Sequence, residues 1–333
     1  MTHTIGVLGS GSWGTALAVH LARTGHDVRL WARDAGLATA MAARRQNPVY
    51  LPGIMFPPSL TPTASTAEAI AGATFVVMAV PSHGLRGVAR AAAPMTPAGV
   101  TFVSAAKGLE EGSLLRMSEV IRAELREAGP IVVLSGPSFA IELARELPTA
   151  MVAAGESPAA VEMVQAHFRS PALRLYGSAD VVGVEIGGAL KNIIAIAAGV
   201  VEGLGLGHNA LAALITRGLA EVSRLAVALG AQRDTLSGLA GLGDLVLTCT
   251  GDLSRNRQVG IALARGEKLE DILSRTKMVA EGVRTTEAAL ALGARHGIEL
   301  PIALEMSEVL AGRKSPQAAI RDLMGRRQKL EHV

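Results

Sequence analysis

The feature that most constrains this chain is a run of three glycines, spaced G-x-G-x-x-G, directly after a short apolar segment. The segment is Thr4–Leu8, the glycines are Gly9, Gly11 and Gly14, and helical periodicity follows over residues 13–24. In a strand–loop–helix unit the first glycine permits the tight turn, the second lets a pyrophosphate approach the backbone, and the third allows close helix–strand packing. The helix N-terminus adds free N–H groups and a partial positive charge. This context predicts dinucleotide binding more strongly than a simple glycine-rich turn.

The rest of the first half alternates short apolar runs with helical patterns. A helical stretch reaches Arg45, and residues 46–66, rich in proline and uncharged, predict a loop. Strands separated by helices of this length are typical of βαβ units and of a doubly wound parallel sheet. The predicted strands are Thr4–Leu8, Asp27–Trp31, 75–80, 100–104, 131–134, 149–153 and 174–176, and further helices are predicted from residue 83, over 114–127 and after residue 158.

The pattern changes near Gly183, after which helical periodicity dominates. The predicted helices are 184–201, 209–229, 257–265, Leu269–Ser274, 285–296 and 303–311. We therefore expect an α/β chain with a dinucleotide-binding Rossmann domain over residues 1–182 and an all-helical, substrate-binding domain over residues 183–333. The arginine-rich tail, residues 321–329, is expected to be a solvated face.

Composition excludes several classes of protein. A formal net charge of +3 over 333 residues, with two Trp, two Tyr and five Phe, argues against a nucleic-acid partner. The single cysteine, Cys249, excludes an intrachain disulfide and favours a reducing compartment, and the eight histidines show no metal-ligand spacing. The N-terminus shows no signal peptide. We also expect no apolar run as long as the ~18 residues that a membrane-spanning helix needs. We expect a cytoplasmic protein without membrane insertion, and its apolar helical half is compatible with a homodimer.

The end of the second predicted strand bears on the choice of dinucleotide. An acidic residue at this place would bind the ribose 2′-hydroxyl of NAD, whereas an arginine accommodates the 2′-phosphate of NADP. Arg33 stands here, directly followed by Asp34, and Arg44 and Arg45 lie a little further along the chain. Arg33 favours NADP, and Asp34 keeps NAD open.

Two lysines occupy unusual surroundings in a chain that has 26 arginines and only six lysines. Lys107 follows the predicted strand 100–104 among Ala and Gly, where ligands of a doubly wound sheet bind. Lys191 lies in the most apolar helix and has no carboxylate at i±3 or i±4. Desolvation lowers the pKa of a lysine, which suits it to general acid–base catalysis near neutral pH. The alternative for Lys191 is a side chain that extends to solvent.

Three further polar segments are candidates for parts of a binding site. The turn 135–140 contains Gly136 and Ser138 after a predicted strand, although a plain strand-to-helix turn would look the same. Asp244 stands in a glycine-rich turn. Ser254, Arg255 and Asn256 resemble a helix start that would suit a phosphate, or merely a capped helix. From these residues alone we infer a nicotinamide-dependent oxidoreductase with a lysine as acid and base and an anionic substrate.

Eight blocks, in this order, carry a resemblance to a known family: GSGSWGTALA, SAAKGLE, SGPSFA, GGALKNIIAIAAG, NALAALITRGL, GLAGLGDLVLTCT, SRN and AEGVRT. Spread over nearly the whole chain, they resemble bacterial NAD(P)-dependent glycerol-3-phosphate dehydrogenase. The resemblance implies hydride transfer between sn-glycerol 3-phosphate, a small phosphorylated substrate, and dihydroxyacetone phosphate, with NADP or NAD as cofactor, in the service of glycerophospholipid synthesis. It also implies a helical domain of the 6-phosphogluconate dehydrogenase type.

The resemblance also assigns roles to individual residues, with Lys191 as the proton donor and acceptor. It implies that the dinucleotide contacts Ser12, Trp13, Arg33, Lys107, Ala140, Arg255, Val279 and Glu281. It implies that the substrate contacts Lys107, Gly136, Ser138, Lys191, Asp244, Ser254, Arg255 and Asn256. Ser138 and Ala280 stand where the family often has Thr and Val. Two alternatives stay open: a related β-hydroxyacid dehydrogenase acting on a carboxylate substrate, and a non-catalytic NAD(P)-binding redox sensor.

Overall fold

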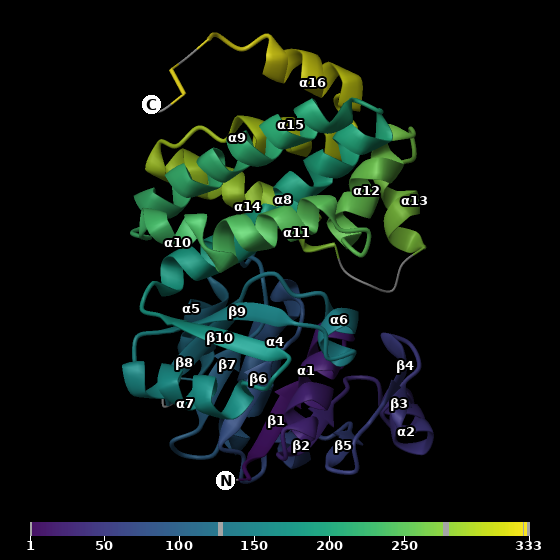
Figure 1. Ribbon diagram of the computed structural model, residues 1–333, viewed down its shortest axis with the longest axis vertical. Helices are drawn as coiled ribbons and strands as arrows, with labels where there is room; N and C mark the ends of the chain where they lie inside the picture. The colour runs from purple at the N-terminus through teal and green to yellow at the C-terminus, as the bar shows by residue number, and fades with distance from the viewer. Residues whose placement is uncertain (1, 126–128, 276–279, 329, 332–333) are drawn as a thin grey trace.

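The computed structural model of the chain describes residues 2–125, 129–275, 280–328 and 330–331. It consists of a half built around a β-sheet, at the bottom of Figure 1, and a helical half above it. In Figure 1 the N label lies at the far end of the sheet half and the C label at the opposite end of the molecule, in the upper part of the helical half. The prediction of an α/β half followed by an all-helical half is confirmed.

The sheet has eight strands in the order β10-β9-β8-β7-β6-β1-β2-β5. Their bounds are β1 Thr4–Leu8, β2 Asp27–Trp31, β5 Leu60–Thr63, β6 Phe75–Met78, β7 Thr101–Ser104, β8 Ile131–Ser135, β9 Thr149–Gly155 and β10 Leu173–Ser178. β1 is paired in parallel with β2 on one side and with β6 on the other. The chain therefore winds outward in both directions from β1, and ligands of such sheets bind at this switch point.

One pair of neighbouring strands departs from the predicted parallel sheet. β9 runs antiparallel to β8, and β10 is parallel to β9. The helix between β8 and β9 is α6, Ala140–Ala144, which has five residues. At ~1.5 Å per residue it advances about 7.5 Å, too little to return along the roughly 16 Å of a five-residue strand. The chain consequently re-enters the sheet from the edge at which it left.

The expectation that residues 46–66 form a loop is wrong. Gln46–Asn47 (β3) and Leu51–Met55 (β4) pair as a small antiparallel ribbon, and β5 extends the main sheet beside β2. Prolines lie within β4 and β5. Proline is tolerated in such edge strands because its missing N–H faces away from the partner strand.

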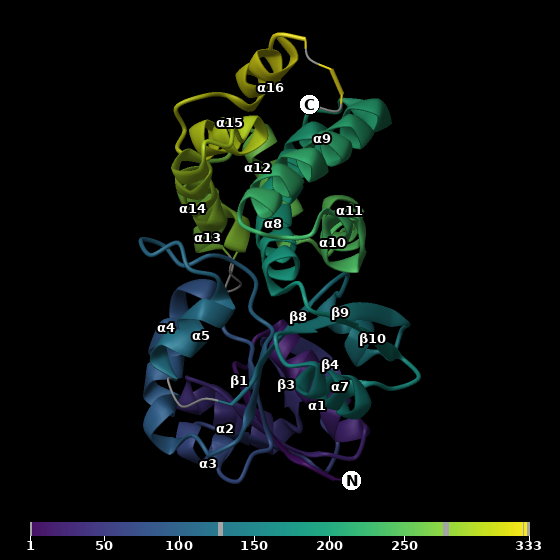
Figure 2. The ribbon, with the colours of Figure 1, turned by 90° about the vertical axis from the view of Figure 1, so that its left-hand side faces the viewer.

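Helices cover both faces of the sheet. One face carries α1 (Ser12–Arg23), α2 (Ala35–Arg44), α6 and α7 (Pro158–Phe168), and the other carries α3 (Thr66–Ile70), α4 (Ser82–Ala92) and α5 (Met117–Glu124). Figure 2 shows α4 and α5 on one side of the strands and α7 on the other. α5 begins three residues later than expected, because Leu114 has a left-handed φ of 63° and the chain turns there. The predicted end of this helix, Glu127, lies outside the described residues.

The helical half is organised around α8, which runs up through its centre (Figure 2) and packs against α9, α11, α12 and α14. The expectation that no apolar run is long enough to span a membrane is wrong for α8, which has 23 residues and a mean hydropathy of 1.6. Because 89% of its most apolar window is buried inside the protein, α8 is a core helix. The bounds are α8 Val181–Gly203, α9 Gly207–Ala228, α10 Arg233–Ser237, α11 Asp244–Thr250, α12 Arg255–Ala264, α13 Leu269–Ser274, α14 Glu281–His296, α15 Pro301–Leu310 and α16 Pro316–Met324.

The crossing of α8 and α12 is unusually close. A Cβ atom added to Gly199 of α8 would lie 1.9 Å from the carbonyl oxygen of Arg257, and one added to Gly260 of α12 would lie 1.9 Å from that of Ile196. The two backbones therefore touch where glycine has no side chain. This contact fixes the start of α12 relative to α8, which carries Lys191.

Candidate active site

The glycine-rich loop after β1 has the shape that a pyrophosphate requires. Gly9 has a φ of 122°, and a Cβ there would lie 2.5 Å from the carbonyl oxygen of Ala79, while a Cβ at Gly14 would lie 1.9 Å from that of Gly9. A Cβ at Gly11, by contrast, would have nothing within 4 Å. The N-terminus of α1 has no side-chain cap and no acidic residue in its first turn. Open space beside the N-terminus of a helix without a side-chain cap fits a dinucleotide phosphate.

Asn47, a residue that the sequence analysis passed over, holds this loop in place. Its side chain is fully buried, and Nδ2 donates to the carbonyl oxygen of Ser10 at 2.8 Å and to Oγ1 of Thr15 at 2.9 Å. Its Oδ1 accepts from the N–H of Tyr50 at 3.0 Å, and Ser12 Oγ donates to the carbonyl oxygen of Tyr50 at 2.7 Å. The β3–β4 ribbon thereby supports the loop. Trp13 packs against the core of the sheet half.

Of the charged residues that follow β2, some are exposed and others form hydrogen bonds within the protein. Arg33 and Arg44 are exposed. Asp34 caps α2, since its Oδ1 accepts from the N–H groups of Gly36 at 2.8 Å and Leu37 at 3.2 Å. The Arg45 guanidinium donates to the carbonyl oxygens of Phe56, Pro57 and Leu60. The acid and one of the arginines are thus engaged within the protein.

Two lysines from different halves meet at one carboxylate. Asp244 is 1% exposed, and its Oδ1 accepts from Nζ of Lys191 at 2.6 Å while its Oδ2 accepts from Nζ of Lys107 at 2.6 Å. Lys107 follows β7, so its ammonium reaches up from the sheet, and Lys191 comes from the middle of α8. The carboxylate that Lys191 lacks on its own helix is supplied by α11. All three residues are candidates from the sequence, but their pairing could not be predicted from it.

Burial sets the acidity of Lys191. Desolvation lowers the pKa of its ammonium, the charge of Lys107 adds to this effect and the charge of Asp244 partly opposes it, and the resulting pKa is about 8 in place of 10.5. A group with this pKa can give or take a proton near neutral pH.

Thr248 is a further residue of this cluster that the sequence did not reveal. Its hydroxyl donates to the backbone carbonyl of Asp244 at 2.6 Å and accepts from Nζ of Lys191 at 2.7 Å. Both residues belong to α11, which follows one turn of π-helix, Leu239–Gly243. The chain bends tightly there, because a Cβ at Gly241 would lie 2.0 Å from the carbonyl oxygen of Leu236. This turn presents Asp244 and Thr248 to α8.

The turn after β8 lies next to Lys107. The carbonyl oxygen of Gly136 accepts from Lys107 Nζ at 3.1 Å and from Ser138 Oγ at 2.9 Å. Gly136 has a φ of 135°, which strongly favours glycine. Ala140 is the first residue of α6 and is half-buried. Lys107, Gly136 and Ser138 therefore share one edge of the sheet with the glycine-rich loop.

The start of α12 combines packing with an exposed cation. Ser254 caps the helix by accepting from the N–H of Arg257 at 3.3 Å, and Arg255 is exposed. Asn256 is buried, and its amide donates to Asn192 Oδ1 at 2.9 Å and accepts from the N–H of Gly282 at 3.0 Å. Because Asn192 follows Lys191, the start of α12 lies beside the lysine's turn of α8.

Glu281, at the start of α14, spans the two halves. Its carboxylate accepts from the N–H of Ser82 at 3.1 Å and from the hydroxyl of Ser82 at 2.6 Å. It also interacts electrostatically with Arg255. Val279, another residue proposed from the resemblance, lies outside the described residues.

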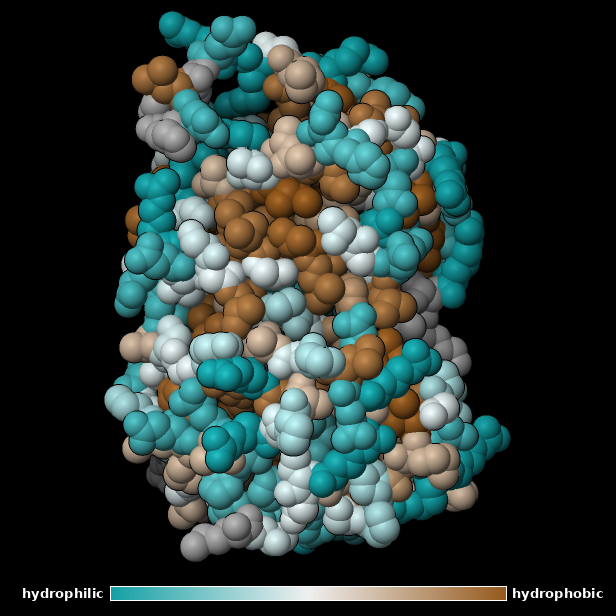
Figure 3. Space-filling model, viewed as in Figure 1, coloured by the Kyte–Doolittle hydropathy of each residue, from teal (hydrophilic) through white to brown (hydrophobic). Residues whose placement is uncertain are grey.

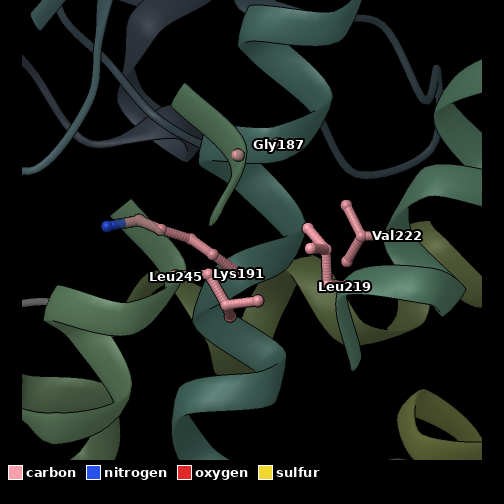
Figure 4. Close-up of a pocket in the computed structure, with 6 residues that line it drawn as sticks. Gly187, Lys191, Leu219, Val222 and Leu245 are labelled. Atoms are coloured by element: carbon pink, nitrogen blue, oxygen red, sulfur yellow. The ribbon is translucent and has the colours of Figure 1, made fainter. Parts of the chain in front are cut away.

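A small apolar pocket lies behind the Lys191 side chain (Figure 4). It is lined by Gly187, Lys191, Leu219, Val222, Gly241 and Leu245. The Lys191 ammonium points away from Leu219 and Val222, toward the side where Asp244 contacts it. Apolar side chains thus surround the stem of the lysine and leave its charge to the polar cluster.

Comparisons with known proteins agree along the whole chain. The family described as NAD-dependent glycerol-3-phosphate dehydrogenase matches residues 4–161 with its N-terminal model and residues 180–321 with its C-terminal model. A glycerol-3-phosphate dehydrogenase (NAD(P)+) of Geobacter sulfurreducens is 53% identical and covers 99% of both chains, and one of Stenotrophomonas maltophilia is 49% identical and covers 98% of this chain and 96% of its own.

A solved structure gives the same result. The glycerol-3-phosphate dehydrogenase of Coxiella burnetii superposes with a TM-score of 0.94 at 40% identity, and the match covers 98% of this chain and 99% of that one. Its sheet and helical halves correspond to those described above. The chain belongs to the NAD-dependent glycerol-3-phosphate dehydrogenase family.

Proposed function

We propose that the protein interconverts sn-glycerol 3-phosphate and dihydroxyacetone phosphate with NAD(P), and that Lys191 is its proton donor and acceptor. The observation that carries the assignment of roles is the buried Lys107–Asp244–Lys191 cluster at the carboxyl edge of the sheet. When bound, the reduced nicotinamide supplies the hydride for the carbonyl carbon. Glycerol 3-phosphate made in this way would feed glycerophospholipid synthesis.

Lys191, Asp244 and Lys107 each have a different role in the proposed proton transfer. In the reductive direction the Lys191 ammonium donates a proton to the oxygen on which negative charge develops, and Asp244 keeps the ammonium charged and oriented. Thr248 accepts from the Lys191 ammonium and donates to the backbone carbonyl of Asp244, so it gives the ammonium a second partner on α11. Lys107 orients and polarises the same substrate oxygen from the sheet side.

The start of α12 is the part of the site that we assign to the substrate phosphate. Arg255 is exposed there and can bind two phosphate oxygens, and the first N–H groups of α12 favour an anion. Asn256 is already hydrogen-bonded to Asn192 and Gly282, so we assign it to holding the start of α12 as well as to the substrate. Gly136 and Ser138 would complete the site on the sheet side.

Replacement of the proposed acid tests this assignment. Lys191→Met should lower turnover by about 10²–10⁴-fold, the usual contribution of general acid catalysis, while the affinity for reduced cofactor remains. The assay mixes the protein with dihydroxyacetone phosphate and reduced cofactor and follows the loss of nicotinamide absorbance. Turnover equal to that of the unmodified protein would exclude Lys191 as the acid.

The same assay separates the two alternative functions. A β-hydroxyacid dehydrogenase would turn over a carboxylate substrate in place of the phosphorylated one, and the exposed Arg255 at a helix start favours the phosphate. A redox sensor would bind cofactor without consuming it, and the buried Lys191 of lowered pKa favours catalysis.

We assign the choice between the two cofactors to Arg33. It is exposed directly after β2, where a 2′-phosphate would lie, and the nearby Asp34 already caps α2. Parallel assays with NADPH and NADH measure this preference, which we expect to favour NADPH.

The remaining assignments concern the whole chain. We propose that residues 1–182 bind the dinucleotide and residues 183–333 the substrate. The change from strands to helices, between the end of β10 at Ser178 and the start of α8 at Val181, lies close to this division. We also propose a cytoplasmic homodimer. Its support is an apolar area on the surface of the helical half (Figure 3). Leu242 and Val246 are among the exposed large apolar side chains of that half. Sedimentation equilibrium measures the oligomeric state.

A further inference from the structure

Ser82 is a buried residue of the sheet half to which the proposed reaction assigns no role. It is 3% exposed and is the first residue of α4, directly after the loop that follows β6. β6 is the neighbour of β1 in the sheet, so Ser82 stands at the edge where the proposed dinucleotide would lie. Its backbone N–H and its hydroxyl donate to the two oxygens of Glu281, at 3.1 Å and 2.6 Å.

Ser82 also touches the loop that carries Lys107. Gly108 has a φ of 146°, and a Cβ there would lie 2.8 Å from Cβ of Ser82 and 3.4 Å from Oε2 of Glu281. The serine, the carboxylate and the residue after Lys107 are therefore packed with no room for a further methyl group. Movement of Glu281 would leave this side of the Lys107 loop without support.

On its other side Glu281 is connected to the lysine helix. The next residue, Gly282, donates its N–H to Asn256, and Asn256 donates to Asn192, which follows Lys191. A Cβ at Gly282 would lie 2.6 Å from the carbonyl oxygen of Asn192. Contacts thus run from Gly108, next to Lys107, through Ser82 and Glu281 to Asn192, next to Lys191. The ion pairs of Asp244 connect the two lysines directly.

We propose that Ser82 is a positioning residue, which holds Glu281 and thereby fixes the start of α14 against the Lys107 loop where the dinucleotide binds. The proposal rests on the proposed function only in taking the bound group to be NAD(P). Ser82 donates to both oxygens of Glu281 and so orients the carboxylate, which also interacts with Arg255, and the contribution of Glu281 to cofactor affinity depends on this orientation. A site that is preorganised in this way binds more tightly than one that must be ordered during binding.

The test measures the affinity of the free protein for cofactor. Ser82→Ala should raise the dissociation constant for NADPH and NADH about tenfold, the factor expected when a hydrogen bond to a charged group is lost. The quenching of fluorescence from the two tryptophans, Trp13 and Trp31, reports binding without turnover. At saturating cofactor, kcat should change by less than about twofold, because the lysine–aspartate cluster is intact. An unchanged dissociation constant would overturn the proposal.

Ser118 provides a matched control. It is also a buried serine at the start of a helix, and its N–H and hydroxyl donate to a carboxylate of the helical half, Glu185, at 2.8 Å and 2.6 Å. Ser118→Ala should lower the thermal midpoint without weakening cofactor binding. If both variants raise the dissociation constant equally, Ser82 acts only by joining the two halves, and the positioning role is wrong.

A double-variant cycle distinguishes indirect from direct action of Glu281. If Glu281 acts through Ser82, the effects of Ser82→Ala and Glu281→Ala on the dissociation constant should be strongly non-additive, with the pair no worse than Glu281→Ala alone. Additive losses would mean that Glu281 works independently of Ser82, which contradicts the proposal. Failure of the proposed function would be distinct: the unmodified protein would bind cofactor and respond to Ser82→Ala but leave dihydroxyacetone phosphate unreduced.

Discussion

Lys191 is held between two opposing effects, and their balance determines the pH at which it changes protonation state. Burial in the apolar environment of α8 disfavours its ammonium form, while Asp244 at 2.6 Å favours it. The resulting pKa of about 8 lies well below the 10.5 of a free lysine. A lysine on the surface would be almost fully protonated at pH 8 and a poor base, so burial is what makes the residue useful in both directions of the reaction.

The pH dependence of the reaction follows from this balance. Reduction needs the ammonium form, so kcat/KM for dihydroxyacetone phosphate should fall as pH rises above about 8. Asp244→Asn removes the main influence that raises the pKa of Lys191 and leaves desolvation and the charge of Lys107, so the decline should begin at lower pH. Pre-steady-state and steady-state rates measured from pH 6 to 10 would show the displacement.

An exposed carboxylate of the same segment is the control for that experiment. Asp252 pairs with Arg257 and its side chain is 91% exposed. Asp252→Asn should leave the alkaline decline in place, because a solvated charge has little influence on a buried lysine. An alkaline decline that is unchanged in Asp244→Asn would show that a group other than Lys191 controls it.

At the scale of elements, the crossing of α8 and α12 determines where the proposed phosphate site lies. Gly260 has no room for a side chain, since its Cβ would lie 1.9 Å from a backbone oxygen of α8. Gly260→Ala should therefore separate the helices and lower the free energy of unfolding by about 1–3 kcal/mol, despite the better helix propensity of alanine. It should also raise KM for dihydroxyacetone phosphate, because Arg255 moves with α12.

Gly87 in α4 provides a control that separates the effect of steric overlap from the effect of helix propensity. A Cβ at Gly87 would have nothing within 4 Å, so Gly87→Ala should leave activity unchanged and stabilise the protein by up to ~1 kcal/mol. Urea unfolding of both variants measures the difference. Equal stability of Gly260→Ala and the unmodified protein would mean that the crossing can relax without loss.

The elements differ in how far the sequence could predict them. β1 and β2 have the bounds that were expected, because β1 is a nearly continuous apolar run and β2 alternates buried Val28 and Leu30 with less buried residues. The β3–β4 ribbon and β5 were missed, since an edge strand containing proline lacks the alternation that marks a buried one. The antiparallel direction of β9 was also missed, because the strand pattern of its residues does not record the direction in which the strand enters the sheet.

The residues of the candidate site also differ in how far the sequence could predict them. Lys107 and Lys191 could be selected because each stands in apolar or small-residue surroundings, which are visible in the sequence. Thr248, Asn47 and Ser82 could not, because their roles come from hydrogen-bond partners 57, 37 and 199 residues away. A hydroxyl or amide with a remote partner looks in the sequence like any other polar residue.

At the scale of the whole molecule, three carboxylates of the helical half join it to the sheet half. Asp244 binds Lys107, Glu281 binds Ser82, and Glu185 binds Ser118 together with Arg116. The first belongs to the proton-transfer cluster and the second to the cofactor edge. The third lies on α8 six residues before Lys191, so it anchors the catalytic helix to the start of α5.

Loss of the ion pair between Glu185 and Arg116 should mainly lower the stability of the protein. Burial raises the pKa of its carboxyl, and the Arg116 guanidinium at 2.8 Å opposes that effect. Arg116→Met would leave an unpaired charge in the interior, which should lower the free energy of unfolding by about 3–5 kcal/mol at pH 7.5. The pKa of Glu185 would rise further in this variant, so a proton taken up at lower pH relieves the penalty, and the deficit relative to the unmodified protein should shrink toward pH 5.

Arg122, which lies on α5, provides the control for a general loss of surface charge. Its partner is Glu156, and the two side chains are 57% and 78% exposed, so Arg122→Met should change stability by no more than about 0.5 kcal/mol at either pH. Urea unfolding at pH 5 and pH 7.5 gives the comparison. If the deficit of Arg116→Met were the same at both pH values, Glu185 would not be the group left uncompensated. The junction of the two halves would then depend on the packing of Arg116 and not on its charge.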